Sequence, residues 1–435
     1  MTVLLCAVAC GSDPELPPDP SPADASVDAG PTDGGPIDAG SIAISLTHTA
    51  TSPLGAAVGP VTFVTDEIAL AATETGVRAL RTSGPSAGQS PAGFQEWALT
   101  STGSGAAASA IAVPPAGALG GTIAVFLPAG QPQLGALEVG GPGAQGVLLG
   151  EAMLDAPLAG SFPAGLLAPA SGPGSDALWI ADAPFGPGGV LRAYPYASWT
   201  PAARRLHEDA GRSYTPVATD LDGDGSDEVP VLGRPFVSAD GALGLSTFTV
   251  AGNSAPGAAG GVDVFDLATG DLLGRVVVPV ADSSTGTLGF VGSAAIWGDW
   301  LVVAAADKDA TFADVGGQLA IYRIQSRRPF RVVDVDPAAD YDQPTTRIPT
   351  STGNTVAVTV VDRFAFVLSA PFFGDATIDV IDLGAPSPEV IEVLEIGPPF
   401  ATGMNIPQEP SVSPDGTQLL LGTEHGIVRI ELERR

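Results

Sequence analysis

Three aspartates alternate along a short acidic segment in the middle of the chain, residues 219–229. They fill positions 1, 3 and 5 of a loop that starts at Asp220, and a glycine takes position 6. A hard cation such as Ca²⁺ requires oxygen ligands at positions 1, 3 and 5, a glycine for the sharp turn at 6 and a carbonyl at 7. The segment therefore predicts a calcium site with these ligands: Asp220, Asp222, Asp224, the main-chain carbonyl of Ser226, and Glu228.

The spacing is not that of an EF-hand, because Val231 stands where the twelfth-position Glu would be and the flanks read as strands. The alternative is a plain acidic hairpin turn, since Asp and Gly favour turns on conformational grounds alone. Calcium is preferred because three alternating carboxylates would repel one another without a cation. With every ligand in one local loop, the ion is expected to be structural.

The other residues that could act in catalysis do not together match the pattern of a known type of active site. His48, His207 and His425 lack the spacing of a zinc site. The segment Gly84–Gly88 matches a nucleophile-elbow pattern, but it falls in a Gly/Ser/Pro loop rather than between a strand and a helix. Acidic pairs within residues 334–342 could serve glycosidic acid–base chemistry or a second cation, although loop carboxylates are usually only solvated. We therefore expect a protein that is not an enzyme.

Composition narrows the fold class. The 435 residues include 56 Gly and 41 Pro, only 15 % are charged, and 45 % are hydrophobic. Gly and Pro disfavour helix interiors, whereas the hydrophobic content is too high for a chain disordered throughout. A turn-rich all-β protein is what remains. The net charge of −30 argues against nucleic acid as a partner, because phosphate binding needs clustered Arg and Lys.

One unit recurs along the chain: an apolar run, a glycine-containing turn, and a second run that alternates apolar and polar residues. Its copies span residues 67–81, 109–127, 177–194, 245–267, 300–324, 364–383 and 418–432. Serial hairpins of this kind predict a β-propeller of seven four-stranded blades over residues 41–435. Two long gaps leave room for an eighth blade, for example around residues 146–154. A β-sandwich is the alternative, and it fits serial hairpins less naturally.

The two ends of this domain are expected to meet. The last copy should pair with a strand from residues 41–65, because such closure removes the exposed edges of the ring. Nearly continuous apolar runs, such as Leu301–Ala306, predict strands that are covered on both faces.

The acidic loop resembles an FG-GAP repeat, the calcium-binding blade element of integrin-α-type and related bacterial propellers. In that family a D-x-[DN]-x-D-G-x-x-[DE] loop joins two strands of a blade. The resemblance implies side-chain ligands at Asp220, Asp222, Asp224 and Glu228, a main-chain ligand at Ser226, and the turn at Gly225. Residues 293–324 share the hydrophobic frame without the aspartate spacing, so one metal loop is expected. The final copy, preceded by Ser413–Gly416 as a tight turn, also resembles blades of bacterial propellers.

The N-terminus suggests an anchor followed by a tether. Cys10 ends an apolar stretch directly after Ala9, which resembles the lipobox of bacterial lipoproteins, where the lipidated cysteine follows small residues. Residues 1–10 are therefore interpreted as a signal remnant with a lipidated Cys10. No Lys or Arg precedes Arg78, from which we infer a true start codon upstream. Two incidental cysteines are the alternative. Residues 11–40 read as a disordered acidic Pro/Ala/Gly/Asp linker.

These observations predict a cell-envelope lipoprotein, at the outer membrane on its periplasmic or surface face. Its calcium-stabilised FG-GAP-type propeller is expected to be a monomer that binds an unknown protein or glycan without catalysis, and that meets the membrane through its lipid anchor alone. The alternative is a secreted propeller hydrolase that acts on polysaccharide or ester substrates, with carboxylates lining the central channel.

Overall fold

The computed structural model describes residues 42–49, 58–82, 97–98, 108–128, 134–139, 147–154, 165–182, 189–203, 205–222, 224–228, 230–250, 257–281, 288–309, 313–351, 353–370, 375–397, 409–423 and 426–434. Cys10 and the linker over residues 11–40 lie outside the described residues, as does the Gly84–Gly88 motif. No helix among the described residues is long and apolar enough to cross a membrane.

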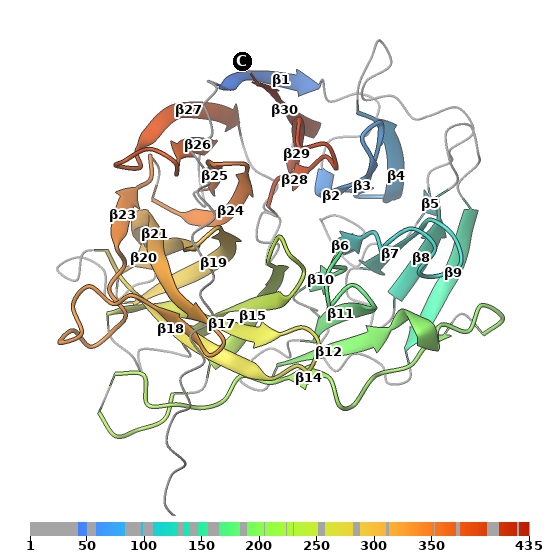
Figure 1. Cartoon of the computed structure of the whole chain (residues 1–435). Helices are drawn as coiled ribbons and strands as arrows, with labels where there is room; N and C mark the ends of the chain where they lie inside the picture. The colour runs from blue at the N-terminus through green and yellow to red at the C-terminus, as the bar shows by residue number, and fades with distance from the viewer. Residues whose placement is uncertain are drawn as a thin grey trace, which may run out of the picture. The chain divides into compact units, whose positions relative to one another are not determined.

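Residues Ile42–Arg434 build seven small sheets arranged in a ring, a seven-bladed β-propeller (Figure 1). The prediction of an all-β propeller is confirmed. Apart from one short 3₁₀ turn, η1 (Tyr196–Ser198), every named element of the described chain is a strand. Blades are numbered here by the chain order of their innermost strands.

The first three blades fill residues 58–214. Blade 1 contains β2 (Val58–Thr65), β3 (Ile68–Thr73), β4 (Gly76–Arg81) and β5 (Trp97–Ala98). Blade 2 contains β6 (Ala108–Ala112), β7 (Ile123–Pro128), β8 (Leu134–Glu138) and β9 (Val147–Leu154), with β13 (Arg205–Leu206) parallel to β9. Blade 3 contains β10 (Gly165–Leu167), β11 (Ala177–Asp182), β12 (Val190–Pro195) and β14 (Ser213–Tyr214).

The other four blades complete the ring. Blade 4 contains β15 (Pro230–Val237), β16 (Leu243–Val250), β17 (Ala258–Asp266) and β18 (Leu272–Pro279). Blade 5 contains β19 (Leu288–Trp297), β20 (Trp300–Lys308), β21 (Asp314–Arg327) and β22 (Phe330–Val332), and β23 (Thr346–Pro349) also pairs with β21. Blade 6 contains β24 (Thr355–Val361), β25 (Phe364–Ser369), β26 (Ala376–Asp382) and β27 (Val390–Gly397). Blade 7 contains β28 (Ser411–Val412), β29 (Gln418–Thr423), β30 (Gly426–Arg434) and β1 (Ile42–Thr49).

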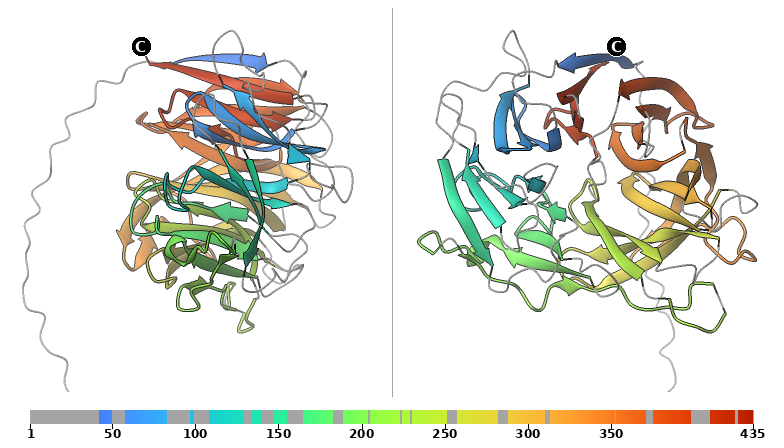
Figure 2. Two further views of the ribbon diagram at one scale, coloured as in Figure 1. Left: turned by 90° about the vertical axis from the view of Figure 1, so that its right-hand side faces the viewer. Right: turned by 180° about the vertical axis from the view of Figure 1, so that it is seen from behind.

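Blade 7 joins the two ends of the domain, as predicted. Strand β1 pairs antiparallel with β30 in one unbroken register, from Ile42 opposite Arg434 to Thr49 opposite Ile427. Figure 2 shows β1 lying beside β30 along the outer side of the ring. The chain's first described strand thus serves as the outermost strand of its last blade and covers the edge of β30.

The repeat assignment needs one correction in blade 2. Six of the predicted hairpins are the second and third strands of a blade, but residues 109–127 hold β6 and β7, the first and second strands. The segment at 146–154 is β9, which belongs to the same sheet, so the suggestion of an eighth blade is wrong. The reason is physical: a glycine turn between two apolar runs looks alike whichever two strands it joins.

The core lies between neighbouring blades. Every residue of the second strands β3, β11 and β25 is buried, and so are Leu301–Lys308 of β20, which confirms strands covered on both faces. Glycines face aromatic rings across the strand pairs Gly135–Phe126 and Gly244–Phe265. A Cβ atom at either glycine would lie less than 3 Å from the ring. Part of the glycine content is therefore required by packing rather than by turns.

Ring closure gives the first prediction. Removing residues 1–49 deletes β1 and leaves β30 with an open edge, so the midpoint of thermal unfolding should fall by roughly 4 °C, from a loss of about 3 kcal/mol. Removing only residues 1–41 retains β1 and should leave the midpoint unchanged. Differential scanning calorimetry of the two truncations makes the comparison. Equal midpoints would show that the β1–β30 pairing contributes nothing to stability.

Candidate metal loop

The acidic loop (residues 219–228) lies in the connection between blade 3 and blade 4. The chain leaves β14 at Tyr214 and enters β15 at Pro230. The sequence predicted a strand on each side, but only β15 forms, because residues 215–218 belong to no strand and Val217 is 58 % exposed. The loop therefore joins two blades, whereas the FG-GAP pattern places its loop between two strands of one blade.

The fold brings three of the predicted ligands together. Each of Asp220, Asp222 and Asp224 offers a carboxylate oxygen, and these oxygens lie within 4.8 Å of one another. The two ends of the loop are tied by a pair of backbone hydrogen bonds between Thr219 and Glu228, with N–O distances of 3.1 and 2.9 Å. The loop is thus a closed turn that holds its three aspartate carboxylates close together.

Backbone amides of the loop also point at these carboxylates. Gly225 N donates to Asp220 Oδ2 at 2.9 Å, and Asp224 N donates to Asp222 Oδ1 at 3.1 Å. Gly225 has a φ of +88°, a backbone conformation in which a side chain would be strained. The glycine at position 6 therefore has the turn-forming role that the sequence indicated.

The other two predicted ligands are placed differently. The Ser226 amide donates to Asp224 Oδ1 at 2.7 Å, and its side chain is exposed. Glu228 is only 3 % exposed and lies outside the group of three, with its Oε2 accepting a hydrogen bond from Leu221 N at 2.7 Å. Leu221 in turn packs into a buried cluster with Phe248, Ala258, Val277 and Tyr341. The sequence did not predict that Leu221 anchors the loop in this cluster. The available signal was an apolar residue between two acidic ones, Asp220 and Asp222.

The second acidic segment, residues 334–342, lies against this loop. Burial, together with the charges of Asp222, Asp340 and Glu228, raises the pKa of Tyr341 to about 12. Asp342 Oδ2 accepts a hydrogen bond from Val277 N at 2.8 Å, and burial raises the pKa of its carboxyl. Asp334 Oδ1 accepts the amides of Asp336 and Gln343 at 3.0 and 3.1 Å. Asp334 and Asp342 thus bond to main-chain amides.

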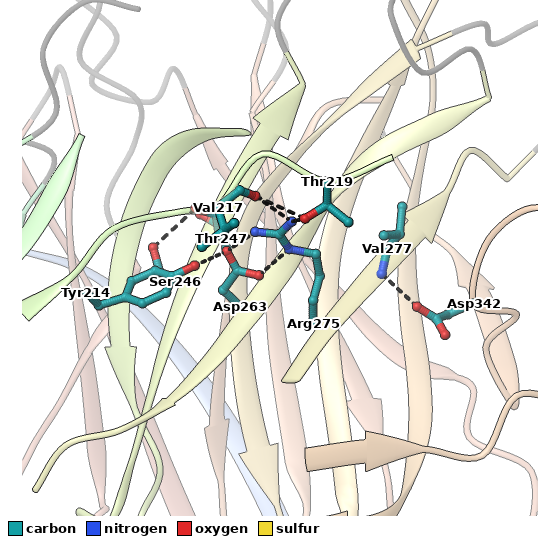
Figure 3. A network of polar contacts seen from close by, with 9 residues as sticks. All are labelled: Tyr214, Val217, Thr219, Ser246, Thr247, Asp263, Arg275, Val277 and Asp342. Carbon is teal, nitrogen blue, oxygen red and sulfur yellow. Dashed lines mark hydrogen bonds and ion pairs between the residues drawn. The ribbon is translucent and has the colours of Figure 1, made fainter. Parts of the chain in front are cut away.

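A buried ion pair fastens the base of the acidic loop to blade 4 (Figure 3). Asp263 on β17 is fully buried. Arg275 on β18 donates to both of its carboxylate oxygens, from Nε to Oδ1 at 2.6 Å and from Nη2 to Oδ2 at 2.9 Å. The Tyr214 hydroxyl donates a third hydrogen bond to the Asp263 carboxylate. Arg275 Nη1 also donates hydrogen bonds to the segment that enters the loop, to Val217 O and Thr219 Oγ1, both at 3.0 Å.

Aromatic contacts hold this ion pair in place. The Tyr214 ring stacks on Phe265 with a centroid separation of 5.1 Å, and Arg275 lies over the Phe248 ring at 4.8 Å. Burial and the neighbouring Asp263 charge raise the pKa of Tyr214 above its ordinary value, so the hydroxyl remains a donor. Blades 3 and 4 and the acidic loop are therefore joined by one network.

The centre of the ring is where a propeller hydrolase would hold its catalytic carboxylates. A cavity there is lined by a single carboxylate among the described residues, Glu409. A glycosidase needs two carboxyl groups about 5–10 Å apart, and the described lining does not contain that arrangement. No known protein family matches the sequence, and no curated protein matches it either.

The ion pair gives the second prediction. Substituting Arg275→Met leaves Asp263 as an uncompensated buried charge, which should lower the free energy of unfolding by about 3–5 kcal/mol. Arg275→Lys retains the charge without the two-point contact and should fall between wild type and Arg275→Met. The exposed Arg331 on β22 provides the matched control, Arg331→Met, with no expected change. Urea unfolding measures all three, and an unaltered Arg275→Met midpoint would contradict the role given to this network.

Proposed function

We propose that the acidic loop binds one Ca²⁺ ion and that the ion stabilises the junction of blades 3 and 4. The observation that carries this proposal is the convergence of three carboxylates within 4.8 Å on a loop closed by its own backbone. Calcium takes six to eight oxygen ligands, and clustered carboxylates that repel one another are relieved by a cation. Asp220, Asp222 and Asp224 would supply the central ligands, and the Ser226 carbonyl and Glu228 remain the predicted further ligands.

The contacts that hold the acidic loop in place are consistent with calcium binding. Glu228, Leu221 and the Arg275 network hold its base before any ion binds. A preorganised loop loses less conformational entropy on binding than a flexible one. All of the proposed ligands are local, so the ion would stabilise the fold rather than present itself to a substrate.

We further propose that the propeller is a non-catalytic binding module of the bacterial cell envelope, carried on a lipid anchor at Cys10 and the acidic linker. The propeller fold supports this proposal because it displays many loops on a rigid ring, as FG-GAP propellers resembling integrin-α heads do. The ligand would be a protein or a glycan. The chain's charge of −30 favours a partner other than nucleic acid.

Calcium binding gives the third prediction. At a hundredfold excess over its dissociation constant, Ca²⁺ should stabilise the folded protein by about 2.7 kcal/mol relative to EGTA, seen as a rise in melting temperature. Asp222→Ala removes a central ligand and should melt identically in Ca²⁺ and EGTA. Asp227, an exposed acid of the same loop, offers the matched control: Asp227→Ala should keep the calcium-dependent rise. A wild-type protein insensitive to Ca²⁺ would refute the site.

The anchor gives the fourth prediction. Expressed from its own locus in cells fed radiolabelled palmitate, the protein should incorporate label and fractionate with membranes. Cys10→Ser should abolish both, whereas Cys6→Ser should leave both unchanged. Labelling that persists in Cys10→Ser, or that is absent from wild type, would exclude Cys10 as the lipidated residue.

A further inference from the structure

Strand β27 is the outermost strand of blade 6 and the last strand of its sheet. Among the described residues it pairs with β26 and with no other strand, and Figure 1 shows it along the outer side of the ring. The edge of a sheet presents unpaired backbone N–H and C=O groups, which can pair with a strand of another chain. The outer edge of β27 therefore offers an extended segment a row of hydrogen-bonding groups.

Several other outer edges of the ring are short or covered. Strands β5, β13 and β14 each contain only two residues, and β22 contains three. Strand β18 is as long as β27, but its last four residues are buried, and its Val277 amide donates to the Asp342 carboxylate. Short strands and covering groups protect sheet edges from pairing with other chains. Strand β27, by contrast, has eight residues and is exposed over residues 391–393.

Two large apolar side chains are exposed on β27. Ile391 and Val393 are 51 % and 46 % exposed, whereas Leu394 and Ile396 are buried in the core between blades 6 and 7. The β26–β27 register shifts at Ile391, which is the extra residue of a bulge. Single exposed apolar residues are normal at a protein surface. Two of them on one open strand edge add apolar contact area for a strand that pairs there.

Three glutamates determine which kind of strand fits this edge. Glu389, Glu392 and Glu395 follow one another at a spacing of three residues, and all three are exposed. None of them forms an ion pair with a described residue. Pairing with β26 is regular from Glu392 to Glu395, so these two side chains lie on opposite faces of the sheet.

The charges of these glutamates exclude one occupant and favour another. Like charges directly opposite each other destabilise a pair of strands, and opposite charges stabilise it. A second copy of β27 would bring glutamates against glutamates. A strand with basic residues three positions apart would instead place one positive charge beside Glu392 and one beside Glu395.

We propose that the outer edge of β27 binds an extended segment of a partner protein in which two basic residues, three positions apart, flank apolar β-branched residues. The segment would extend the blade 6 sheet by one strand. Its basic side chains would face Glu392 and Glu395, and its apolar side chains would contact Ile391 and Val393. Main-chain hydrogen bonds give affinity in this mode of binding, and the flanking side chains give selectivity. The inference rests on the proposed role as a binding module and names a protein as the partner.

The test is fluorescence anisotropy of labelled peptides with the full chain in calcium-containing buffer. The peptide TVTKVVKVT has the required spacing in either strand direction and should bind at millimolar concentrations or below. Two control peptides should bind at least tenfold more weakly: TVTEVVEVT reverses the charges, and TVTKPPKVT keeps them but contains prolines that prevent strand pairing. Equal binding of TVTKPPKVT would show attraction to the net charge alone and would overturn the proposal. Absence of binding by TVTKVVKVT would overturn it as well.

Charge reversal assigns the site. The double variant Glu392→Lys and Glu395→Lys should bind TVTKVVKVT at least tenfold more weakly than wild type does, and TVTEVVEVT at least tenfold more tightly. Glu67→Lys with Glu74→Lys changes two exposed glutamates of blade 1 by the same charge and should bind both peptides as wild type does. Circular dichroism monitors folding, and the wild-type peptide comparison stands even if the β27 variant does not fold. A folded β27 variant that binds TVTKVVKVT as tightly as wild type would overturn the proposal.

Analytical ultracentrifugation tests for the other occupant of a strand edge, a second copy of the chain. Wild type should sediment as a monomer. A wild-type dimer that dissociates in Val393→Asp would assign the edge to self-association and overturn the proposal. None of these measurements depends on calcium release or on Cys10, so failure at β27 is distinguishable from failure of the calcium or anchor proposals.

Discussion

Closure of the ring is the constraint on which the rest of this structure depends. A blade has two faces, and both are covered only when a neighbour stands on each side, as the fully buried second strands β3, β11 and β25 show. The pairing of β1 with β30 supplies the last neighbour contact. The central cavity is lined by strands from around the ring, so it depends on this closure.

Local patterns were readable from the sequence, and contacts between distant segments were not. The alternating aspartates of the acidic loop lie within a few residues, so their convergence followed from spacing alone. The period-two pattern of β17 says on which face Asp263 lies, but not that Tyr214 from blade 3 covers that face. The Arg234–Glu409 pair joins segments far apart in the chain, and no local rule connects them.

The same distinction explains the error in blade 2. Its first hairpin, β6–β7, has the apolar runs and glycine turn that mark the second hairpin of other blades. Hydrophobic periodicity identifies strands without stating their order from the axis of the ring. The order became visible only through pairing, with β9 on the same sheet as β6. The number of blades was therefore predictable from the repeat. The position of each hairpin within its blade was not.

The seam between β1 and β30 also has a kinetic consequence. Every other pair of neighbouring strands within the four core positions of a blade comes from one continuous stretch of chain, whereas Ile42 and Arg434 meet across almost the whole domain. Closing so long a loop costs more entropy than forming a hairpin, and contacts of high sequence separation slow folding. Synthesis on the ribosome delivers β30 after the other strands of the ring, so β1 must wait unpaired until β30 has been made. Closure of this ring therefore depends on its first strand, which is kept free until the other strands of the ring have formed.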